Sequence, residues 1–188
     1  MNIHETIKNR RSIFATAFTG EKIEKAVIHQ LLENANWAPS HKNTEPWRFK
    51  VYTNESLAQL IDVFIQQYKA STPEEKQNVS KILKLEDQKK LVSHLIIIIC
   101  EFSGMVPQME EIAATACAVQ NMYLSLNDLN IAGYWSTGNG TFSEEMRQHL
   151  QLKENQLLMG YFYLGVLDKS LPKPNPRKKP IDEKVEWF

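Results

Sequence analysis

The sequence has no excess of charge of either sign, and it is poor in cysteine. Lys plus Arg and Asp plus Glu each total 22 of the 188 residues, so the formal net charge is zero. No overall field therefore attracts nucleic acid or an acidic membrane. The two cysteines, Cys100 and Cys117, form no C-x-x-C motif, which argues against a disulfide framework or a structural zinc site.

The sequence also lacks any segment that could direct it to a membrane. Its longest strongly apolar run, Leu95 to Cys100, falls far short of the ~20 residues that cross a bilayer. The N-terminal residues have no apolar core of the kind found in secretory signals. Because the cysteine usage also fits a reducing compartment, we expect a cytoplasmic protein that engages neither membrane nor nucleic acid.

The signature motifs of common catalytic and cofactor sites are missing. The chain has only seven glycines and no G-x-G-x-x-G, so a tightly held dinucleotide in a Rossmann site is not expected. It also has no phosphate-binding P-loop, no H-E-x-x-H and no G-x-S-x-G motif. The five histidines are scattered along the chain and none pairs with another at metal-ligand spacing, so we predict no metal site.

What remains is an ordinary globular composition, 43% hydrophobic and 23% charged, and a length that suggests one domain over residues 1–188. Helical and strand patterns alternate, which indicates a mixed α and β architecture. We expect helices at 3–9, from an N-cap at Thr19 to near Ala38, at 55–69, within the polar segment 73–92, from Glu110 to Leu129, and near 143–150. We expect strands at 47–52, 95–100, 131–135 and 157–167.

Two of the helices have apolar residues at spacings of three and four, which predicts that this face packs on a core. The first stripe is Ile23, Val27, Leu31 and Ala35, and the second, on the long helix, is Ile112, Ala116, Val119, Tyr123 and Leu126. From about residue 171 to Pro180, four prolines force an extended segment with few sheet hydrogen bonds. Such a segment must lie across its own subunit, cross to another, or stay loose.

Two polar clusters in the first quarter of the chain could hold a ligand. In Arg10-Arg11-Ser12, two guanidinium groups and a hydroxyl suit a phosphate, although the arginines could instead complement the dipole of a preceding helix. Between Pro39 and Pro46 lies a rigid turn rich in hydrogen-bond donors, which could bind a flat polar ring. The alternative there is that the prolines only end a helix and begin a strand.

A third cluster, Trp135-Ser136-Thr137-Gly138, follows a predicted strand. The ends of strands are common ligand positions, and Gly138 would let a ligand approach the backbone closely. Taken alone, this cluster is better explained as an ordinary turn.

In this order and spacing, the three clusters resemble the FMN-dependent nitroreductase family, and in particular its short members. The resemblance covers nearly the whole chain. Besides the clusters, it includes Gly160-Tyr161-Phe162-Tyr163-Leu164-Gly165 and the basic, proline-flanked segment 176–183.

The resemblance implies an α+β homodimer with a nitroreductase-like fold, in which helices flank a central, mainly antiparallel or mixed sheet and two FMN sites lie at the subunit interface. It assigns the flavin phosphate and ribityl chain to Arg10, Arg11 and Ser12, with added charge from Arg177. The partner subunit would line the isoalloxazine ring with Pro39, Ser40, His41 and Asn43, and Trp37 belongs to the same cofactor-binding set. Trp135, Ser136, Thr137 and Gly138 would lie along the ring, with backbone donors near its N5 atom.

The function that the resemblance implies is hydride transfer from NADH or NADPH through FMN to a small electron-poor acceptor, such as a nitroaromatic or a quinone. One site used twice predicts ping-pong kinetics, with no catalytic side chain. Dehalogenation, enone reduction and a flavin-binding module without turnover remain alternatives; Glu45, where many members have Gln, motivates the last. We expect substrate contacts in segments 65–92 and 102–110, and both cysteines as buried packing residues.

Overall fold

The computed structural model of the protein describes residues 2–167 and 177–188. Its helices are α1 (Ile3–Asn9), α2 (Lys25–Asn36), α3 (Asn54–Ser71), α4 (Val79–Leu91), α5 (Gln108–Ser125) and α6 (Glu144–His149). Its strands are β1 (Trp47–Thr53), β2 (His94–Glu101), β3 (Ala132–Ser136) and β4 (Gln156–Gly165). Each helix and strand expected from the sequence within these ranges is present.

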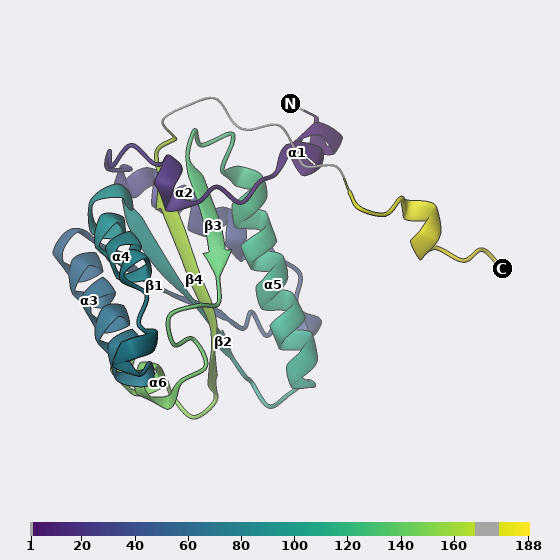
Figure 1. Ribbon diagram of the computed structural model, residues 1–188. Coiled ribbons are helices and arrows are strands. Elements are labelled where there is room, and N and C mark those ends of the chain that lie inside the picture. Colours follow the sequence, from purple (N-terminus) through teal and green to yellow (C-terminus); the bar gives the residue numbers. More distant parts are fainter. Residues whose placement is uncertain (1, 168–176) are drawn as a thin grey trace.

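The four strands form one antiparallel sheet in the order β1-β2-β4-β3. The prediction of a central strand at 95–100 is confirmed, because β2 lies between β1 and β4 and is buried over nearly its whole length. Helices cover both faces of the sheet, with α3 and α4 on one and α2 and α5 on the other (Figure 1). The expected α+β sheet flanked by helices is therefore confirmed.

Side chains of β2 alternate between two hydrophobic cores, as the pleat of a strand requires. Leu95, Ile97 and Ile99 pack with α3 and α4, whereas Ile98 and Cys100 pack with α2 and α5. Each fully buried aliphatic side chain contributes about 1.5–3 kcal/mol of transfer free energy. Burial also raises the pKa of the Cys100 thiol, which fits its expected role in packing.

The helix expected to begin at Thr19 begins later. Glu24 is the N-cap of α2, and Thr19 accepts the backbone N–H of Glu21 within a loop. This loop is held to the sheet instead: the N–H of Thr19 bonds the carbonyl of Val166, and the N–H of Ile23 bonds the hydroxyl of Ser93 at 2.7 Å. Tertiary hydrogen bonds thus replace the first helical turn that the sequence pattern predicts.

The buried face of α5 also differs from the expected stripe. Its fully buried residues are Glu111, Ala114, Thr115, Ala118, Val119 and Met122. The carboxylate of Glu111 is buried because it accepts the backbone N–H of Ser103 through both oxygens. This rotation leaves Ile112 and Ala116 half-buried and Cys117 exposed, so the expectation of a buried Cys117 is wrong.

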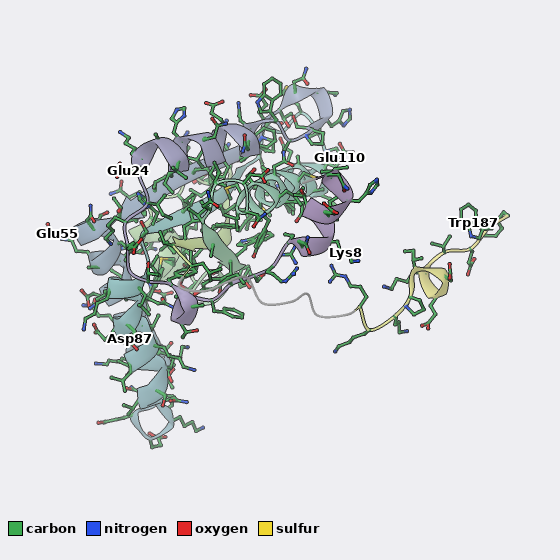
Figure 2. The ribbon with its side chains drawn as sticks, turned by 90° about the horizontal axis from the view of Figure 1, so that it is seen from above. Lys8, Glu24, Glu55, Asp87, Glu110 and Trp187 are labelled. Carbon is green, nitrogen blue, oxygen red and sulfur yellow. The ribbon has the colours of Figure 1, made fainter. Side chains whose placement is uncertain are left out.

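The proline-rich segment predicted from about residue 171 lies largely outside the described residues. The last described segment, residues 177–188, ends in exposed aromatic side chains, and Trp187 is 92% exposed. In Figures 1 and 2 this segment stands apart from the rest of the described chain. None of the described helices has the length and apolar character needed to cross a membrane.

Candidate functional site

Tyr123, on the last turns of α5, joins two of the three clusters singled out in the sequence. Its hydroxyl lies 3.0 Å from the hydroxyl of Ser12 and accepts the backbone N–H of Trp135 at 2.6 Å. The guanidinium carbon of Arg10 lies 4.9 Å from the centre of the Tyr123 ring, a distance typical of a cation–π contact. The first and third clusters are therefore neighbours in space.

The indole of Trp135 is turned toward the sheet and fixed there. A bulge in β4 leaves the carbonyl of Met159 free to accept the indole N–H at 2.9 Å. The next residue, Gly160, has a φ of 120°, and a Cβ there would come within 2.8 Å of the indole nitrogen and 2.4 Å of the carbonyl oxygen of Ser136. Only glycine allows this close approach, which sets where the chain leaves β3.

Two tyrosines of β4 hold the loop after β3 in place, and the tip of this loop is exposed. Tyr161 donates its hydroxyl to the carbonyl of Asn139, and the amide of Asn139 donates to Tyr163 at 3.0 Å. Thr137 and Gly138 at the tip are exposed. A Cβ on Gly138 would meet only the hydroxyl of Ser136, at an ordinary 3.5 Å. The described chain leaves room beside this backbone, as the expected flavin requires.

A cavity of about 320 Å³ lies between α4, the segment that follows the first cluster and the strand residue that precedes Trp135. It is lined by Phe14, Ala15, Thr16, Lys84, Asp87, Gln88, Leu91 and Tyr134. Its aromatic wall continues inward, since the ring of Tyr134 stacks on that of Tyr163 at 4.7 Å with an interplanar angle of 5°. Burial raises the pKa of both phenols, so both stay neutral.

Gln88 gives this cavity an unused hydrogen-bond acceptor. Its side-chain N–H donates to the hydroxyl of Tyr134 at 3.4 Å, which fixes the amide, while its Oε1 atom is buried without a hydrogen-bond partner. A buried carbonyl without a donor is costly. The cavity beside Gln88 thus fits a flat ligand that carries an N–H, as the isoalloxazine ring does, and the residues present fit a flavin.

The two arginines of the first cluster have different surroundings. One guanidinium nitrogen of Arg11 donates to the carbonyls of Lys8, Asn9 and Arg10 at the end of α1. Desolvation and the neighbouring Arg10 lower the pKa of Arg11. These are the contacts of a helix-capping residue, the alternative left open by the sequence. Arg10 instead lies over Tyr123, beside Ser12.

The second cluster lies at the opposite end of α5. The imidazole of His41 contacts the carboxylate of Glu110, with 2.5 Å between Nδ1 and Oε2, and Glu110 is at the beginning of the helix. Ser40 holds the turn by accepting the backbone N–H of Glu45 at 3.2 Å. Positive φ angles at Lys42 (53°) and Asn43 (53°) bend the chain tightly here.

Most residues of this second cluster are exposed to solvent. Pro39, His41 and Asn43 are exposed, Ser40 is half-buried, and Trp37 at the end of α2 is 84% exposed. In one chain the second cluster is therefore open to a ligand or to another chain.

Within one chain, the second cluster stays far from the other two. Glu110 contacts the second cluster and Tyr123 contacts the first and third, and a helix rises 1.5 Å per residue, so about 20 Å of α5 separates them. A single protomer therefore brings Arg10, Ser12 and Trp135 together and leaves His41 and Asn43 apart. Arg177, in the described C-terminal segment, is exposed.

The sequence missed three side chains that shape this region. The sequence pattern indicates only an apolar stripe for Tyr123, a polar surface segment for Gln88 and the start of a helix for Glu110. One signal was available: Gln88 is three residues after Leu85, the buried residue of α4, so both lie on the inner face of that helix.

Comparison with known proteins identifies the family of the chain. The model of the "Nitroreductase family" matches residues 7–166. YfhC of Bacillus subtilis, a candidate NAD(P)H nitroreductase, is 29% identical over 173 residues, which cover 89% of this chain and 86% of YfhC.

Solved structures share the fold over the full length. A nitroreductase-like family protein from Bacillus cereus is 29% identical with a TM-score of 0.85, and the match covers 100% of this chain and 96% of that one. A protein from Desulfovibrio desulfuricans, solved in complex with FMN, is 20% identical with a TM-score of 0.76, over 100% and 99% of the two chains.

Proposed function

Because the chain belongs to the nitroreductase family, we propose that it is an FMN-dependent oxidoreductase that uses NADH or NADPH to reduce a small electron-poor acceptor. When bound, FMN supplies hydride transfer between the nicotinamide and the acceptor. The observation that carries the proposal is the junction at Tyr123, which brings a cationic first cluster and an exposed backbone loop together, beside a small pocket that Arg10, Arg11 and Tyr123 line.

The residues of one protomer would hold the flavin at two places. Arg10 and Ser12 offer a cation and a hydroxyl to the phosphate. The loop from Ser136 to Gly138 offers backbone donors to the edge of the ring, and Gln88 offers its buried acceptor to a ring N–H. Arg177 would add charge at the phosphate.

A homodimer with shared sites would complete each pocket. The second cluster cannot reach the first within one chain, because much of α5 separates them. A second copy could supply Trp37, Pro39, Ser40, His41 and Asn43 to the ring from the opposite side. The half-buried apolar side chains Ile112 and Ala116 give α5 a face that a second copy could cover.

The protein's own residues would then bind and orient the flavin and the substrates and would exclude water from them. These residues would form no covalent bond to the substrates. The Glu110 carboxylate orients the His41 ring so that its other nitrogen points away from α5. One open face that serves the nucleotide and the acceptor in turn predicts ping-pong kinetics. A nitroaromatic or a quinone is the acceptor class that we expect.

Anaerobic mixing of the purified protein with NADH and with NADPH tests this proposal. We expect a yellow protein whose visible flavin absorption bleaches with at least one nucleotide and returns on addition of a nitroaromatic. A yellow protein that bleaches with neither would identify a flavin-binding module instead. A colourless protein that takes up no added FMN would contradict the proposal altogether.

A further inference from the structure

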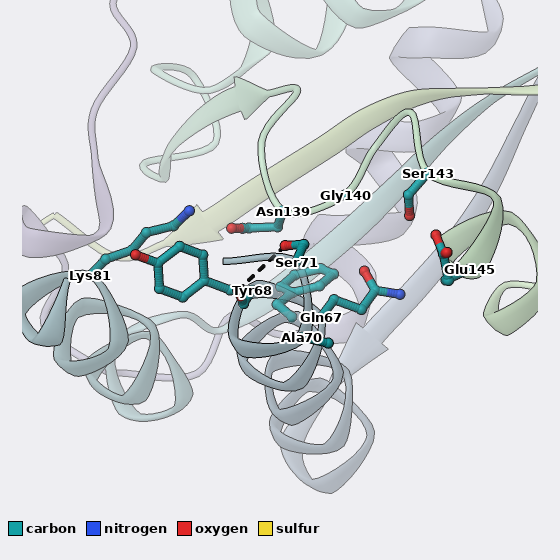
Figure 3. A pocket seen from close by; sticks show the side chains of 10 residues that line it. Gln67, Tyr68, Ala70, Ser71, Lys81, Asn139, Gly140, Ser143 and Glu145 are labelled. Carbon is teal, nitrogen blue, oxygen red and sulfur yellow. Dashed lines mark hydrogen bonds between the residues drawn. The ribbon is translucent and has the colours of Figure 1, made fainter. Parts of the chain in front are cut away.

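The open face of the proposed flavin limits where the residues that recognise the electron acceptor can lie. A cavity of about 270 Å³, between α3, the first turn of α4 and the loop that follows β3, is lined in part by Asn139 and Gly140 (Figure 3). Both follow the exposed loop tip at Thr137 and Gly138, and the cavity lies behind the loop, away from that face. We therefore look to the second cluster, which a second copy of the chain would bring to the ring.

Lys42 lies at the centre of the tight turn in the second cluster, between His41 and Asn43. Its φ of 53° and the equal φ of Asn43 turn the chain sharply, and all three residues are exposed. Since His41 and Asn43 of a second copy are proposed to line the ring, the residue between them would lie beside the open face.

The ammonium group of Lys42 is already held in place. Its Nζ atom donates to the backbone carbonyl of Met105 at 3.3 Å. The loop that carries this carbonyl is itself fixed, because the N–H of Met105 bonds the hydroxyl of Ser103 at 3.1 Å and the N–H of Ser103 bonds the buried carboxylate of Glu111. A side chain that is ordered before binding loses less conformational entropy when a ligand arrives.

The positive charge of Lys42 is available to a ligand. An ammonium group has three N–H donors, and the carbonyl of Met105 accepts one of them. No carboxylate among the described residues forms an ion pair with Lys42: Glu110 pairs with His41, and Glu45 in the same turn makes no such contact. Lys42 can therefore give charge-assisted hydrogen bonds to an anionic group.

Two methionines give the same surface an apolar part. Met105 is 58% exposed and Met109 is 73% exposed, and Met109 directly precedes Glu110, the partner of His41. Methionine side chains adapt to different shapes and make favourable contacts with aromatic rings. A cation beside such side chains suits an aromatic ring with an acidic substituent better than the diphosphate of a nucleotide.

We propose that Lys42 selects the electron acceptor, and that the acceptor is an aromatic compound with an anionic group. Lys42 binds that group while the ring contacts Met105 and Met109. The inference rests on the proposed function, since only a shared site brings Lys42 to a flavin. For a nitro compound the two-electron step is ArNO₂ + NAD(P)H + H⁺ → ArNO + NAD(P)⁺ + H₂O, with the nicotinamide as the reductant, and Lys42 forms no covalent bond in it.

Two probe compounds of similar size isolate the contribution of the anionic group. The probe 4-nitrobenzoate carries a carboxylate, whereas 4-nitrobenzamide has a neutral amide in its place. Calorimetric titration into the oxidised, flavin-loaded protein measures affinity without turnover. We expect the wild type to bind the acid about five-fold more tightly than the amide, the size of one exposed ion pair.

Four variants locate the source of this preference. Lys42→Met keeps the apolar stem and removes the charge, so the preference for acid over amide should vanish, whereas Lys42→Arg keeps the charge and should retain it. Lys76→Met removes an equal charge from the exposed turn before α4 and should leave the preference intact. Met109→Ala removes apolar surface and no charge, so it should weaken both probes alike. Wild-type affinity of Met109→Ala for both probes would overturn the contact between ring and methionines.

Steady-state assays separate the acceptor from the nucleotide. We expect Lys42→Met to raise KM for 4-nitrobenzoate and to leave kcat and the KM for NAD(P)H unchanged. A raised KM for NAD(P)H, with no change for the phosphate-free donor N-benzyl-1,4-dihydronicotinamide, would assign Lys42 to the nucleotide and overturn the inference. An acid preference that persists in Lys42→Met would overturn it as well.

The same experiments distinguish this inference from the proposed function. Protein that bleaches with NAD(P)H but shows no preference dependent on Lys42 would overturn the inference alone. Protein that shows this preference but does not bleach would contradict the proposed function and still support Lys42 as the residue that binds the anionic group.

Discussion

The hydroxyls of Ser12 and Tyr123 lie 3.0 Å apart, although the two residues are on different elements and far apart in sequence. Since the oxygen of Tyr123 already accepts the N–H of Trp135, its own proton can be donated to Ser12. The hydroxyl proton of Ser12 is then available to a ligand. One phenol thus couples the backbone after β3 to the residues proposed to bind phosphate.

Replacing Tyr123 with Phe tests this coupling. The substitution removes both hydrogen bonds and leaves the backbone N–H of Trp135 without its acceptor, so we expect the free energy of unfolding to fall by about 1–2 kcal/mol. The Kd for FMN should rise about five-fold, since one oriented donor is lost. Tyr52→Phe, at a half-buried position on β1, is the matched control. Equal effects in the two variants would show that the junction has no special role.

Replacing Gln88 with Leu should change stability and FMN affinity in opposite directions. The variant removes a buried acceptor without a partner, so the FMN-free protein should unfold at the same or higher urea concentration. FMN should bind less tightly by about five-fold, because the ring N–H loses its acceptor. The exposed Gln59 on α3 provides the control Gln59→Leu. A Gln88→Leu variant with unchanged FMN affinity would remove Gln88 from the cofactor site.

Replacing each arginine of the first cluster should have a different effect in the same two assays, FMN affinity and stability. Arg10→Ala should weaken FMN binding with little change in stability, since this guanidinium lies over Tyr123. Its loss removes a charge-assisted bond to the phosphate, about 1.5–3 kcal/mol. Arg11→Ala should chiefly reduce the helicity and protection of α1, whose last carbonyls it caps. Amide hydrogen exchange over residues 3–9 measures that loss, and the reverse pattern would contradict the assignment.

His94 should make stability depend on pH below neutrality. Desolvation, followed by the charge of Lys22, lowers the pKa of His94 in the folded protein. The hydroxyl of Ser93 accepts the N–H of Ile23 and so directs its proton to Nδ1 of His94 at 2.9 Å, which requires a neutral ring.

The sign follows from proton linkage. A histidine whose pKa is lowered on folding contributes stability above its ordinary pKa of about 6.5, and that stability is lost as the pH falls toward the lower, folded value. Urea unfolding between pH 7.5 and 5 should therefore show a shallower fall in His94→Asn than in the wild type. The exposed His29 on α2 serves as the control, and equal slopes in all three proteins would exclude this role for His94.

Much of the fold could be predicted because the patterns involved are local. The apolar run 95–100 could only be a buried strand, and the prolines around residues 39–46 marked the boundary between α2 and β1. The start of α2 could not be predicted, because it depends on a hydrogen bond from Ile23 to Ser93, far away in sequence. The buried face of α5 depends on the loop before it, where the backbone N–H of Ser103 satisfies the buried carboxylate of Glu111.

The candidate site shows the same division between local and distant information. The motifs singled out Arg10, Ser12 and Trp135 as candidates, since short polar clusters are visible in one stretch of sequence. Gln88 was not found, because a glutamine on a helix looks like a surface residue until the fold buries one of its atoms. Tyr123 looked like a core aromatic, and only the geometry shows that its hydroxyl serves two partners.

The central claim is that each flavin site is built from two chains, and a mixed dimer tests it. One chain would carry Arg10→Ala, and the other, with a different affinity tag, would carry His41→Ala and Asn43→Ala. Each variant dimer alone should bind FMN poorly. If sites are shared, the mixed dimer places all the changes in one site and leaves the other intact.

The measurement is the amount of FMN bound by the mixed dimer after purification through both tags. We predict one tightly bound FMN for each mixed dimer, with the affinity of the wild type and full bleaching by NAD(P)H. A mixed dimer that binds FMN as poorly as its two parents would place the whole site within a single chain and contradict the account.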